Sequence, residues 1–585
     1  MSRLVAIPVA ALLTVLAVVL TPTPAPADAG ESLRDPLAAA SLSSGGHHTC
    51  AIGDTGQLRC WGANFDGQLG IGSNNGTRVN IGDDEAITSV PAVDLGAGRT
   101  AVAVSAGGQH TCAILDTGAV KCWGFNVHGQ LGIDTGGADA GDNESVASLP
   151  AVDLGPGRTA RAISAGGNHT CAILDTGRVR CWGSNGNGQL GLGTTTTIGD
   201  DESPASVDPV YFGPNRTAVA IATGSDHSCA LLDTAQLRCW GQASDGQLGL
   251  GDTVNLGDNE AIIGRLPIDF GVGRTVRALS AAEDLTCVVL DTGQVRCFGR
   301  SNVGALGTGS TDPLGDDEAV TSVAPVFLGL NRTAVGVVAG PANSCALLDD
   351  GALRCWGSDQ YGQLVLAGSD SIGDDEPTLL PNIPLGAGRT VLAASVGGLG
   401  WICAALDTAA LHCWGRNLTG QLGHGDTESL GDDELPTAAG PVPLGRPLRL
   451  TPPVVPPGAN PPGAGPVTGT LSASAAPARD RRRPYRFTVS GSLAGTSSCS
   501  GTVTVTVTGK ARVVGQRRKV AVRGQGSGVL TGTAADCHYT VAVKVVAARK
   551  RWARAALTGR PTAGVRFAGN AGTHPAETTL RLRLG

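Results

Sequence analysis

The stretch His-Thr-Cys-Ala-Ile-Leu-Asp-Thr-Gly-Ala-Val-Lys-Cys-Trp-Gly, from His110 to Gly124, decides the fold. Its two cysteines stand ten positions apart, and an aromatic residue and a glycine follow the second. The arrangement occurs seven times, with first cysteines 62, 59 and then four times 58 residues apart. The pairs are Cys50 and Cys60, Cys112 and Cys122, Cys171 and Cys181, Cys229 and Cys239, Cys287 and Cys297, Cys345 and Cys355, and Cys403 and Cys413. Repeats of this length predict units that bury their faces only by stacking on neighbours.

The Asp-Thr-Gly sequence between the two cysteines is typical of a β-hairpin turn. A three-residue loop ending in Gly118 fits a type I turn closed by a left-handed glycine, and it places Cys112 opposite Cys122. This is a non-hydrogen-bonded pair, whose Cα separation of about 4.5 Å allows a disulfide. We therefore predict one disulfide in each repeat. Buried free thiols are the alternative, and the Cys-x₂-Cys spacing of zinc sites is absent.

The rest of the repeat consists of turns and further short strands. Gly-Gln-Leu-Gly follows the hairpin, as at Gly67, and a Val-Asp-Leu-Gly type strand such as Val93–Gly96 comes later. Gly-Arg-Thr and an Ala/Val-rich strand complete about four strands per repeat, with no helical periodicity. Seven such units predict an all-β chain whose residues 37–450 form a seven-bladed β-propeller. Residues 37–44 and 442–450 are the candidates for closing the ring.

The repeat, with Gly-Gly-x-His-Thr, Asp-x-Gly-x-Val and Trp-Gly-x-Asn-x-x-Gly-Gln-Leu-Gly, resembles that of the regulator of chromosome condensation family. The resemblance covers all seven units and implies a seven-bladed propeller. It implies less about function, because the founding member is a nuclear nucleotide exchange factor for a small GTPase, whereas others bind diverse proteins. A fold of this kind carries many functions.

Residues 1–29 read as an export signal: Arg3 is followed by an apolar run from Leu4 to Leu20 and by small-x-small cleavage sites near Ala27 and Ala29. An uncleaved anchor is the alternative, and no other stretch is apolar enough to cross a bilayer. Sixteen cysteines that all form local pairs agree with an oxidising environment. We expect a secreted or cell-surface monomer, and the excess of Arg over Lys is typical of a GC-rich bacterial genome.

The chain beyond the repeats has the opposite charge. Residues 451–467 are rich in Pro and Gly and predict a linker. Residues 468–585 hold 20 Lys and Arg against three acids, a net charge of +17, whereas the upstream part holds 23 against 47, a net charge of −24. Alternating runs predict a small immunoglobulin-like β-sandwich in this tail, with Cys499 and Cys537 as an eighth pair. This positive charge would bind an anionic cell-envelope polymer, dock on the acidic propeller or face solvent. The tail has few aromatic residues on which bases could stack, which disfavours nucleic acid as the partner.

Every repeat also carries Gly-Asp-(Asp/Asn)-Glu, and carboxylates of this kind are possible Ca²⁺ ligands. The structural interpretation, which we favour, is an acidic turn that caps a short helical turn or pairs with the Gly-Arg-Thr arginine. No cofactor is expected otherwise. The calcium candidates are Asp83, Asp84, Glu85, Asp200, Asp201 and Glu202.

Histidine stands two positions before the first cysteine in four repeats, at His48, His110, His169 and His227, and the same position holds Leu285, Asn343 and Trp401 later. This variation favours a packing position over a catalytic one. No hydrolase, zinc-protease or phosphate-loop motif occurs, so we predict a non-enzymatic protein that binds a protein or an envelope polymer with one propeller face. The alternatives are an extracellular glycan enzyme with carboxylates near the axis and, by resemblance alone, an exchange regulator. The candidates for the binding face are Phe125, His128, Tyr361 and Trp401.

Overall fold

The computed structural model describes residues 41–72, 79–366, 371–375, 381–398 and 400–450, and in the tail only the backbone of the strands between 470 and 584. The chain divides into two compact units, Met1–Val455 and Pro456–Gly585. The predicted signal (1–29), the linker (451–467) and Cys499 lie outside the described residues.

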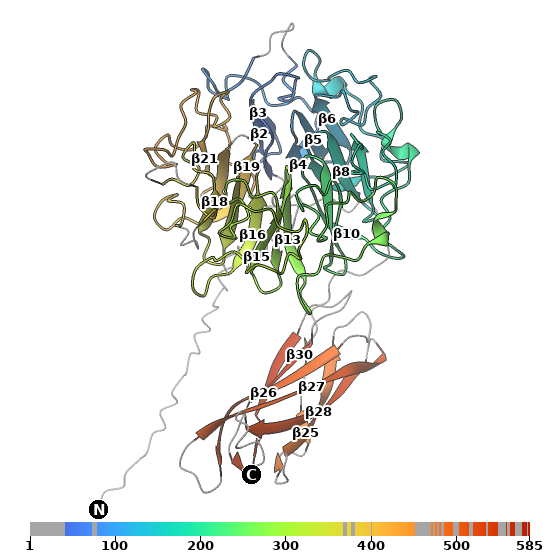
Figure 1. Cartoon of the computed structure of the whole chain (residues 1–585), viewed down its shortest axis with the longest axis vertical. Helices are drawn as coiled ribbons and strands as arrows, with labels where there is room; N and C mark the ends of the chain where they lie inside the picture. Colours follow the sequence, from blue (N-terminus) through green and yellow to red (C-terminus); the bar gives the residue numbers. More distant parts are fainter. Residues whose placement is uncertain are drawn as a thin grey trace, which may run out of the picture. The chain divides into compact units, whose positions relative to one another are not determined.

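The first unit is a ring of seven sheets, each with three antiparallel strands (Figure 1). We number these blades 1 to 7 in chain order. Their strands are β1 (Leu42–Ser44), β2 (His48–Ile52) and β3 (Leu58–Gly62); β4 (Ala101–Ala106), β5 (His110–Leu115) and β6 (Val120–Gly124); β7 (Ala160–Ala165), β8 (His169–Leu174) and β9 (Val179–Gly183); β10 (Ala218–Thr223), β11 (His227–Leu232) and β12 (Leu237–Gly241); β13 (Val276–Ala282), β14 (Leu285–Leu290) and β15 (Val295–Gly299); β16 (Ala334–Ala339), β17 (Asn343–Leu348) and β18 (Leu353–Gly357); and β19 (Val391–Gly397), β20 (Trp401–Leu406) and β21 (Leu411–Gly415).

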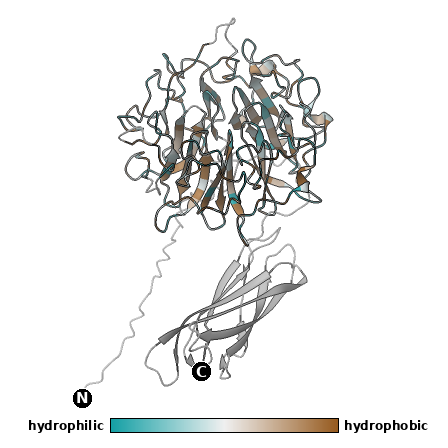
Figure 2. Cartoon of the chain, in the orientation of Figure 1, coloured by the Kyte–Doolittle hydropathy of each residue, from teal (hydrophilic) through white to brown (hydrophobic). Residues whose placement is uncertain are grey.

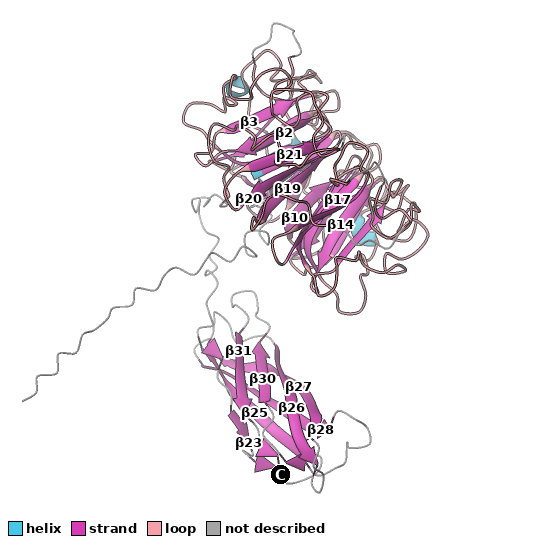
Figure 3. Cartoon of the chain, turned by 90° about the vertical axis from the view of Figure 1, so that its left-hand side faces the viewer, coloured by secondary structure: helices cyan, strands magenta, loops and turns pink. Residues whose placement is uncertain are grey.

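The first strand of each blade lines the axis of the ring. Neighbouring first strands contact one another from β1 through β4, β7, β10, β13 and β16 to β19, and β19 contacts β1 again. Short 3₁₀ helices follow three of the acidic turns at η2 (Val146–Ser148), η3 (Pro204–Ser206) and η4 (Ile262–Gly264). The prediction of an all-β seven-bladed propeller is confirmed, and Figure 3 shows its strands in side view.

The hairpin and its disulfide are confirmed in every blade. Cys112 on β5 lies directly opposite Cys122 on β6, and Gly118 closes the turn at φ +79°. The amides of Leu115 and Gly118 donate to the carbonyls of Ala119 and Leu115, both at 2.8 Å. All seven predicted pairs form disulfides with Cα atoms 4.0–4.1 Å apart. The bonds join Cys50 to Cys60, Cys112 to Cys122, Cys171 to Cys181, Cys229 to Cys239, Cys287 to Cys297, Cys345 to Cys355, and Cys403 to Cys413.

The predicted fourth strand at Val93–Gly96 is wrong. The Val93 amide donates to the Leu58 carbonyl at 2.8 Å, but no strand continues from it. In this repeat a carboxylate oxygen of Asp94 accepts from the Gly96 amide at 3.0 Å and turns the chain directly after this bond. The outer edge of the third strand therefore makes two separate contacts, at Gly62 with Ile81 and at Leu58 with Val93, in place of a continuous fourth strand.

A ring of large aromatic side chains forms the centre of the blade packing. They are Trp61, Trp123, Trp182, Trp240, Phe298, Trp356 and Trp414, all without solvent exposure. In blade 2 the indole Nε1 of Trp123 donates to the Gln68 carbonyl of blade 1 at 3.0 Å. Hydrophobic residues mark many of the propeller strands in Figure 2. Each aromatic side chain is therefore part of the buried core of its blade. Where the residue is tryptophan, its indole N–H can also donate a hydrogen bond to the preceding blade, as Trp123 does.

Close contact between blades requires glycine in the Gly-Gln-Leu-Gly loop. A Cβ on Gly129, whose φ is +72°, would lie 2.4 Å from the Asp200 amide nitrogen in the acidic turn of the next blade. Equivalent contacts run around the ring, and Gly420 of blade 7 meets Asp83 of blade 1 in the same way. The acidic turn therefore seats each blade on its neighbour.

Both candidate segments take part in ring closure. The Asp54 amide donates to the Pro447 carbonyl at 2.9 Å and the Arg449 amide to the Ile52 carbonyl at 3.0 Å. In blade 2 the corresponding first bond joins Asp116 to Thr100, at the start of the inner strand. The end of the propeller sequence thus extends the inner edge of blade 1, where β1 has only three residues.

The second unit contains strands at the predicted places. They are β22 (Thr470–Leu471), β23 (Ser474–Ala476), β24 (Arg479–Asp480), β25 (Tyr485–Ala494), β26 (Thr502–Val513), β27 (Lys519–Thr533), β28 (Asp536–Ala547), β29 (Leu557–Thr558), β30 (Thr562–Phe567), β31 (Ala576–Arg581) and β32 (Arg583–Leu584). Nine of them pair antiparallel in one sheet, and β24 pairs with β32 in parallel. The immunoglobulin-like packing and the pairing of Cys499 with Cys537 stay predictions.

Candidate functional site

The two ends of the blades differ in what they expose. One end carries the Asp-Thr-Gly hairpin turns and the Gly-Arg-Thr turns, and we call it the turn face. Here the arginine pairs with the aspartate of the next blade's hairpin, for example Arg99 with Asp116 at 3.4 Å. The prediction that these arginines pair with the acidic turns is therefore wrong. The other pairs are Arg158–Asp175, Arg216–Asp233, Arg274–Asp291, Arg332–Asp349 and Arg389–Asp407.

The opposite end, the loop face, carries the turns before the second strands and the loops after the third strands. In blade 2 the Phe125 amide donates to the Gln109 carbonyl at 3.0 Å and joins these two loops. The side-chain oxygens of Asn126 and Gln130 accept from the Leu131 and His128 amides, each at 3.0 Å. These bonds fix the loop from inside, so the residues between Asn126 and Gly129 point outward.

The outward loop residues differ from blade to blade. Val127 and Leu418 stand at the same position in blades 2 and 7 and are 57% and 59% exposed. The other occupants of this position are Phe65, Gly186, Ser244, Asn302 and Gln360. A rigid loop framework with variable tips is the usual construction of a binding surface.

Aromatic and basic side chains meet on the loop face of blades 6, 7 and 1. The Arg416 guanidinium lies 5.1 Å from the ring centre of Tyr361, which is a cation–π distance. His47 and Phe65 pack edge to face, with ring centres 6.1 Å apart. Burial and the positive charge of Arg416 lower the pKa of His47. We call Tyr361, Arg416, His47 and Phe65 the cationic arc.

Two of the four predicted binding-face residues form a pair on blade 2. Phe125 and His128 pack edge to face with ring centres 6.2 Å apart, and His128 is exposed. Tyr361 belongs to the cationic arc. Trp401 was a wrong prediction, because it is completely buried within β20. Its indole Nε1 donates to the Thr49 hydroxyl of blade 1 at 3.0 Å, so it joins the ends of the ring.

Carboxylates gather on the loop face of blades 4 and 5. They are Asp226, Asp245, Glu283 and Asp284, which we call the acidic arc. Burial raises the pKa of Asp284, and the nearby charges of Asp245 and Asp226 raise it further, while Arg300, 3.5 Å away, opposes them. Burial also raises the pKa values of Asp226 and Glu283. Four carboxylates against the single arginine Arg300 give this half of the face a negative charge when ionised.

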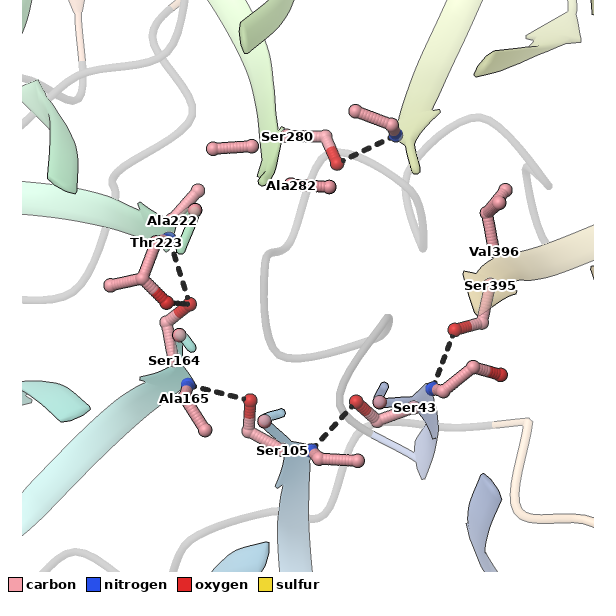
Figure 4. A pocket seen from close by; sticks show the side chains of 18 of the residues that line it. Ser43, Ser105, Ser164, Ala165, Ala222, Thr223, Ser280, Ala282, Ser395 and Val396 are labelled. Carbon is pink, nitrogen blue, oxygen red and sulfur yellow. Dashed lines mark hydrogen bonds between the residues drawn. The ribbon is translucent and has the colours of Figure 1, made fainter. Parts of the chain in front are cut away.

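A cavity of about 350 Å³ follows the axis between the first strands. Small residues line it, and hydroxyls bridge neighbouring blades there (Figure 4). The Ser43 Oγ accepts from the Ala106 amide at 3.0 Å, and the Ser105 Oγ accepts from the Ala165 amide at 2.9 Å. Among the described residues that line the cavity, Glu283 is the one carboxylate. The axis is thus chiefly a structural joint.

The four histidines hold blades together, which the sequence interpretation as simple packing missed. The Nε2 of His48 lies 2.7 Å from the Thr111 hydroxyl of the next blade, and that hydroxyl donates to the Gln68 carbonyl at 2.8 Å. The hydroxyl proton is thereby used, so the neutral His48 ring carries its proton on Nε2. Burial lowers the pKa of His48 to about 3. The equivalent bonds are His110–Thr170, His169–Ser228 and His227–Thr286.

The calcium candidates lie in the acidic turns between blades. In the turns at Asp83–Glu85 and Asp200–Glu202, ligand atoms of all three carboxylates lie within 4.8 Å of one another. The Gly82 amide donates to Glu85 at 3.2 Å, as expected for a capped turn. Burial and hydrogen bonding to Asp201 raise the pKa of Glu202 to about 7. The contacts support the structural interpretation, and calcium binding stays a prediction.

The fold defines a seven-bladed propeller built from sequence repeats. Residues 76–449 match the model of the RCC1-like domain, and residues 39–68 match that of the regulator of chromosome condensation (RCC1) repeat. The chain belongs to the RCC1-like family. Within the described residues no helix is long and apolar enough to span a membrane.

Several curated proteins resemble the propeller. Over 404 residues the chain is 27% identical to the ultraviolet-B receptor UVR8 of Arabidopsis thaliana, covering 68% of this chain and 82% of the receptor. Over 380 residues it is 28% identical to the human regulator of chromosome condensation, covering 62% and 80%. The human E3 ubiquitin-protein ligase HERC2 is 27% identical over 393 residues, which are only 7% of its length. The crystal structure of human WBSCR16 shares the fold, with a TM-score of 0.50, 22% identity and coverage of 63% and 91%.

Proposed function

We propose that this protein is an exported, non-enzymatic binding protein that recognises a protein partner with the loop face of its propeller. The observation that carries the proposal is the construction of this face. The side-chain oxygens of Asn64, Asn126 and Asn417 hold the loops of blades 1, 2 and 7 in the same shape, while the outward residues change from Phe65 to Val127 to Leu418. The family supports the proposal, because propellers of this type often act in protein interaction or regulation.

The glycan-enzyme alternative requires two carboxylates on either side of a bound sugar, roughly 5–10 Å apart. A deep axial pocket with such a pair and a basic residue would favour it. The axial cavity presents Glu283 alone among its described lining residues. The exchange-regulator alternative rests on the names of relatives at 29% identity or less, and a GTPase partner would be absent outside the cell.

Export is the second part of the proposal. Seven disulfides in the propeller suit an oxidising compartment, and the predicted signal at residues 1–29 would direct the chain there. N-terminal sequencing of the protein recovered outside the cytoplasm should begin after Ala27 or Ala29. Recovery of the intact N-terminus in the cytoplasm would contradict export.

The tail extends the proposal to attachment. Residues 468–585, with a net charge of +17, should bind an anionic envelope polymer through many weak contacts screened beyond about 8 Å at physiological salt. We expect the polymer to retain the full-length protein at low salt and to release it as salt rises. A variant that ends at Leu450 should not be retained. Equal retention of both proteins would contradict the attachment role.

Exposed residues on the two faces provide matched variants for testing loop-face binding. Val127→Arg and Leu418→Arg together should abolish capture of envelope and secreted proteins by the immobilised protein. Val272→Arg and Leu330→Arg add the same charge near the Gly-Arg-Thr turns of the turn face, where the native side chains are 102% and 85% exposed. We expect them to leave capture unchanged. Loss of capture in the turn-face variant alone would place the binding site on the turn face and contradict the proposal.

A further inference from the structure

The loop face carries charges of opposite sign on different blades. Arg300 and Arg416 occupy the same position, directly after the aromatic-Gly pair, in blades 5 and 7. Arg300 pairs with Asp284 at 3.5 Å, whereas blade 7 has Gly400 where blade 5 has Asp284. Within the described ranges no carboxylate forms an ion pair with Arg416, and its buried Nε has no hydrogen-bond partner. The positive charge of Arg416 is therefore available to a ligand.

The surroundings of Arg416 suit a carboxylate ligand. The Tyr361 ring lies 5.1 Å from the half-buried Arg416 guanidinium, and stacking on an aromatic face holds such a planar group in place. A planar guanidinium binds a carboxylate through two parallel hydrogen bonds. Phe65 beside His47 is 36% exposed and adds apolar surface for the side chain that carries the carboxylate. The cationic arc thus fits an acidic side chain with neighbouring apolar groups.

A buried amide in blade 1 differs from its counterparts in the next three blades. Gln68 in blade 1 is completely buried, and its Nε2 has no hydrogen-bond partner among the described residues. In the next three Gly-Gln-Leu-Gly loops the corresponding Nε2 donates to Asn168, Asp226 and Asp284. The equivalent neighbour of Gln68 is Gln109 in blade 2, so this buried amide is not part of the cationic arc.

The acidic arc determines which macromolecule fits the whole face. A uniformly anionic polymer that crossed from blade 7 to blade 4 would meet Asp226, Asp245, Glu283 and Asp284. Burial raises the pKa values of Asp226, Glu283 and Asp284, and the charges of Asp245 and Asp226 raise that of Asp284 further, so these carboxylates already lack solvent or repel one another. A protein surface carries both signs and can place each charge against its opposite.

We propose that the loop face docks a protein partner in one orientation, with an acidic segment on the cationic arc of blades 6, 7 and 1 and a basic segment on the acidic arc of blades 4 and 5. This inference rests on the proposed function and specifies its partner. The Arg416 guanidinium, which has no carboxylate partner among the described residues, and the carboxylates of two neighbouring blades together fix the direction.

Photo-crosslinking of two probe peptides to the full-length protein tests the orientation. One peptide is glutamate-rich, the other is lysine-rich, and each carries a benzophenone. Because the tail is basic, the position of the adduct found by mass spectrometry is the readout. We expect the glutamate-rich peptide on residues 358–362, 416–419 and 63–66, and the lysine-rich peptide on residues 242–245 and 283–284.

Arg416→Gln and Arg300→Gln form a matched pair of variants. Loss of a charge-assisted hydrogen bond should reduce adducts of the glutamate-rich peptide on the loop face about tenfold in Arg416→Gln. Arg300→Gln removes an arginine already neutralised by Asp284, so these adducts should stay unchanged. Circular dichroism of both variants checks that the propeller remains folded.

The outcomes separate the orientation from the proposed function. Adducts of both peptides on the loop face in mixed or exchanged positions would overturn the orientation and leave protein binding intact. Adducts confined to other surfaces would overturn both. A loop-face dimer, detected by concentration-dependent sedimentation, would show that a second copy of the chain occupies the face. Displacement of the glutamate-rich peptide, but not of the lysine-rich peptide, by polygalacturonate would favour an anionic polymer as the occupant. Either result would contradict the proposal.

Discussion

Two junctions of the ring, between blades 1 and 2 and between blades 6 and 7, come from the same repeat but are held differently. At the first, His48 donates to the Thr111 hydroxyl, and the Ser43 hydroxyl accepts from the Ala106 amide. The same positions at the second junction hold Asn343, Ile402 and Val338. Asn343 donates to two carbonyls in its own blade, so neither bond crosses the second junction.

The indole bond is common to both junctions. Trp123 donates to the Gln68 carbonyl at 3.0 Å, and Trp414 donates to the Gln363 carbonyl at 2.9 Å. Packing of a large aromatic side chain with this bond is therefore the general joint. The histidine and serine bonds are additions that individual junctions have or lack, so we expect each of them to contribute less stability than the aromatic joint.

Truncation of the common joint should have the largest effect. Trp123→Ala removes a fully buried side chain and should lower the free energy of unfolding by about 3–5 kcal/mol in urea denaturation followed by circular dichroism. Trp123→Phe keeps most of the packing, as Phe298 does in blade 5, and should cost about 1 kcal/mol for the lost hydrogen bond. Equal losses in both variants would show that the packing of the ring stabilises the blade less than the hydrogen bond does.

Acid should weaken the histidine junctions selectively. Burial lowers the pKa of His110 to about 3 from an ordinary value of 6.5, so the unfolded chain takes up the proton first as pH falls. Stability is lost from about pH 6.5 down toward pH 3, by about 2 kcal/mol per histidine at pH 5.

His110→Leu, the residue found at Leu285, isolates this effect. The variant loses the bond to Thr170 at pH 7, but it should lose about 2 kcal/mol less than the wild type between pH 7 and pH 5. Urea denaturation at both pH values provides the comparison, in which carboxylate contributions cancel. Parallel losses in both proteins would contradict the buried neutral histidine.

The serine hydrogen bonds should have a smaller effect on stability, and removing one or adding one should change stability in opposite directions. Ser105→Ala removes the acceptor of the Ala165 amide and should cost about 0.5–1.5 kcal/mol. Ala222 stands at the same position in blade 4 and offers no hydroxyl to blade 5. Ala222→Ser should therefore raise the melting temperature relative to the wild type. A loss of stability in Ala222→Ser would show that space, not hydrogen bonding, limits this position.

The loop face should contribute least to stability. Arg416→Gln removes the cation–π contact with Tyr361 across blades 6 and 7, worth about 0.5–1 kcal/mol at an exposed site. The same denaturation measurement should show a change within that range. A loss comparable to that of Trp123→Ala would mean that Arg416 holds the weaker junction together, and its role in binding would need revision.

The sequence by itself determined the blades. The loop Asp116–Gly118 and the ten-residue cysteine spacing are local, so the register of Cys112 and Cys122 follows from turn geometry alone. Repetition then fixed the number of blades, because each unit needs a neighbour to cover it. Local reasoning failed where a side chain ends a segment, as Asp94 does after Val93.

Only the tertiary structure decided which residues meet between blades. His48 and Thr111 are 63 residues apart, and Trp401 reaches Thr49 across 352 residues, so no local pattern reveals either bond. Trp401 stands in the histidine position, which its variation predicts to be a packing position, yet the indole N–H of Trp401 replaces the histidine donor at the closing junction. The physical reason is that a closed ring places each residue against a residue of the next repeat. Whether a hydrogen bond forms between blades therefore depends on a residue that is distant in the sequence.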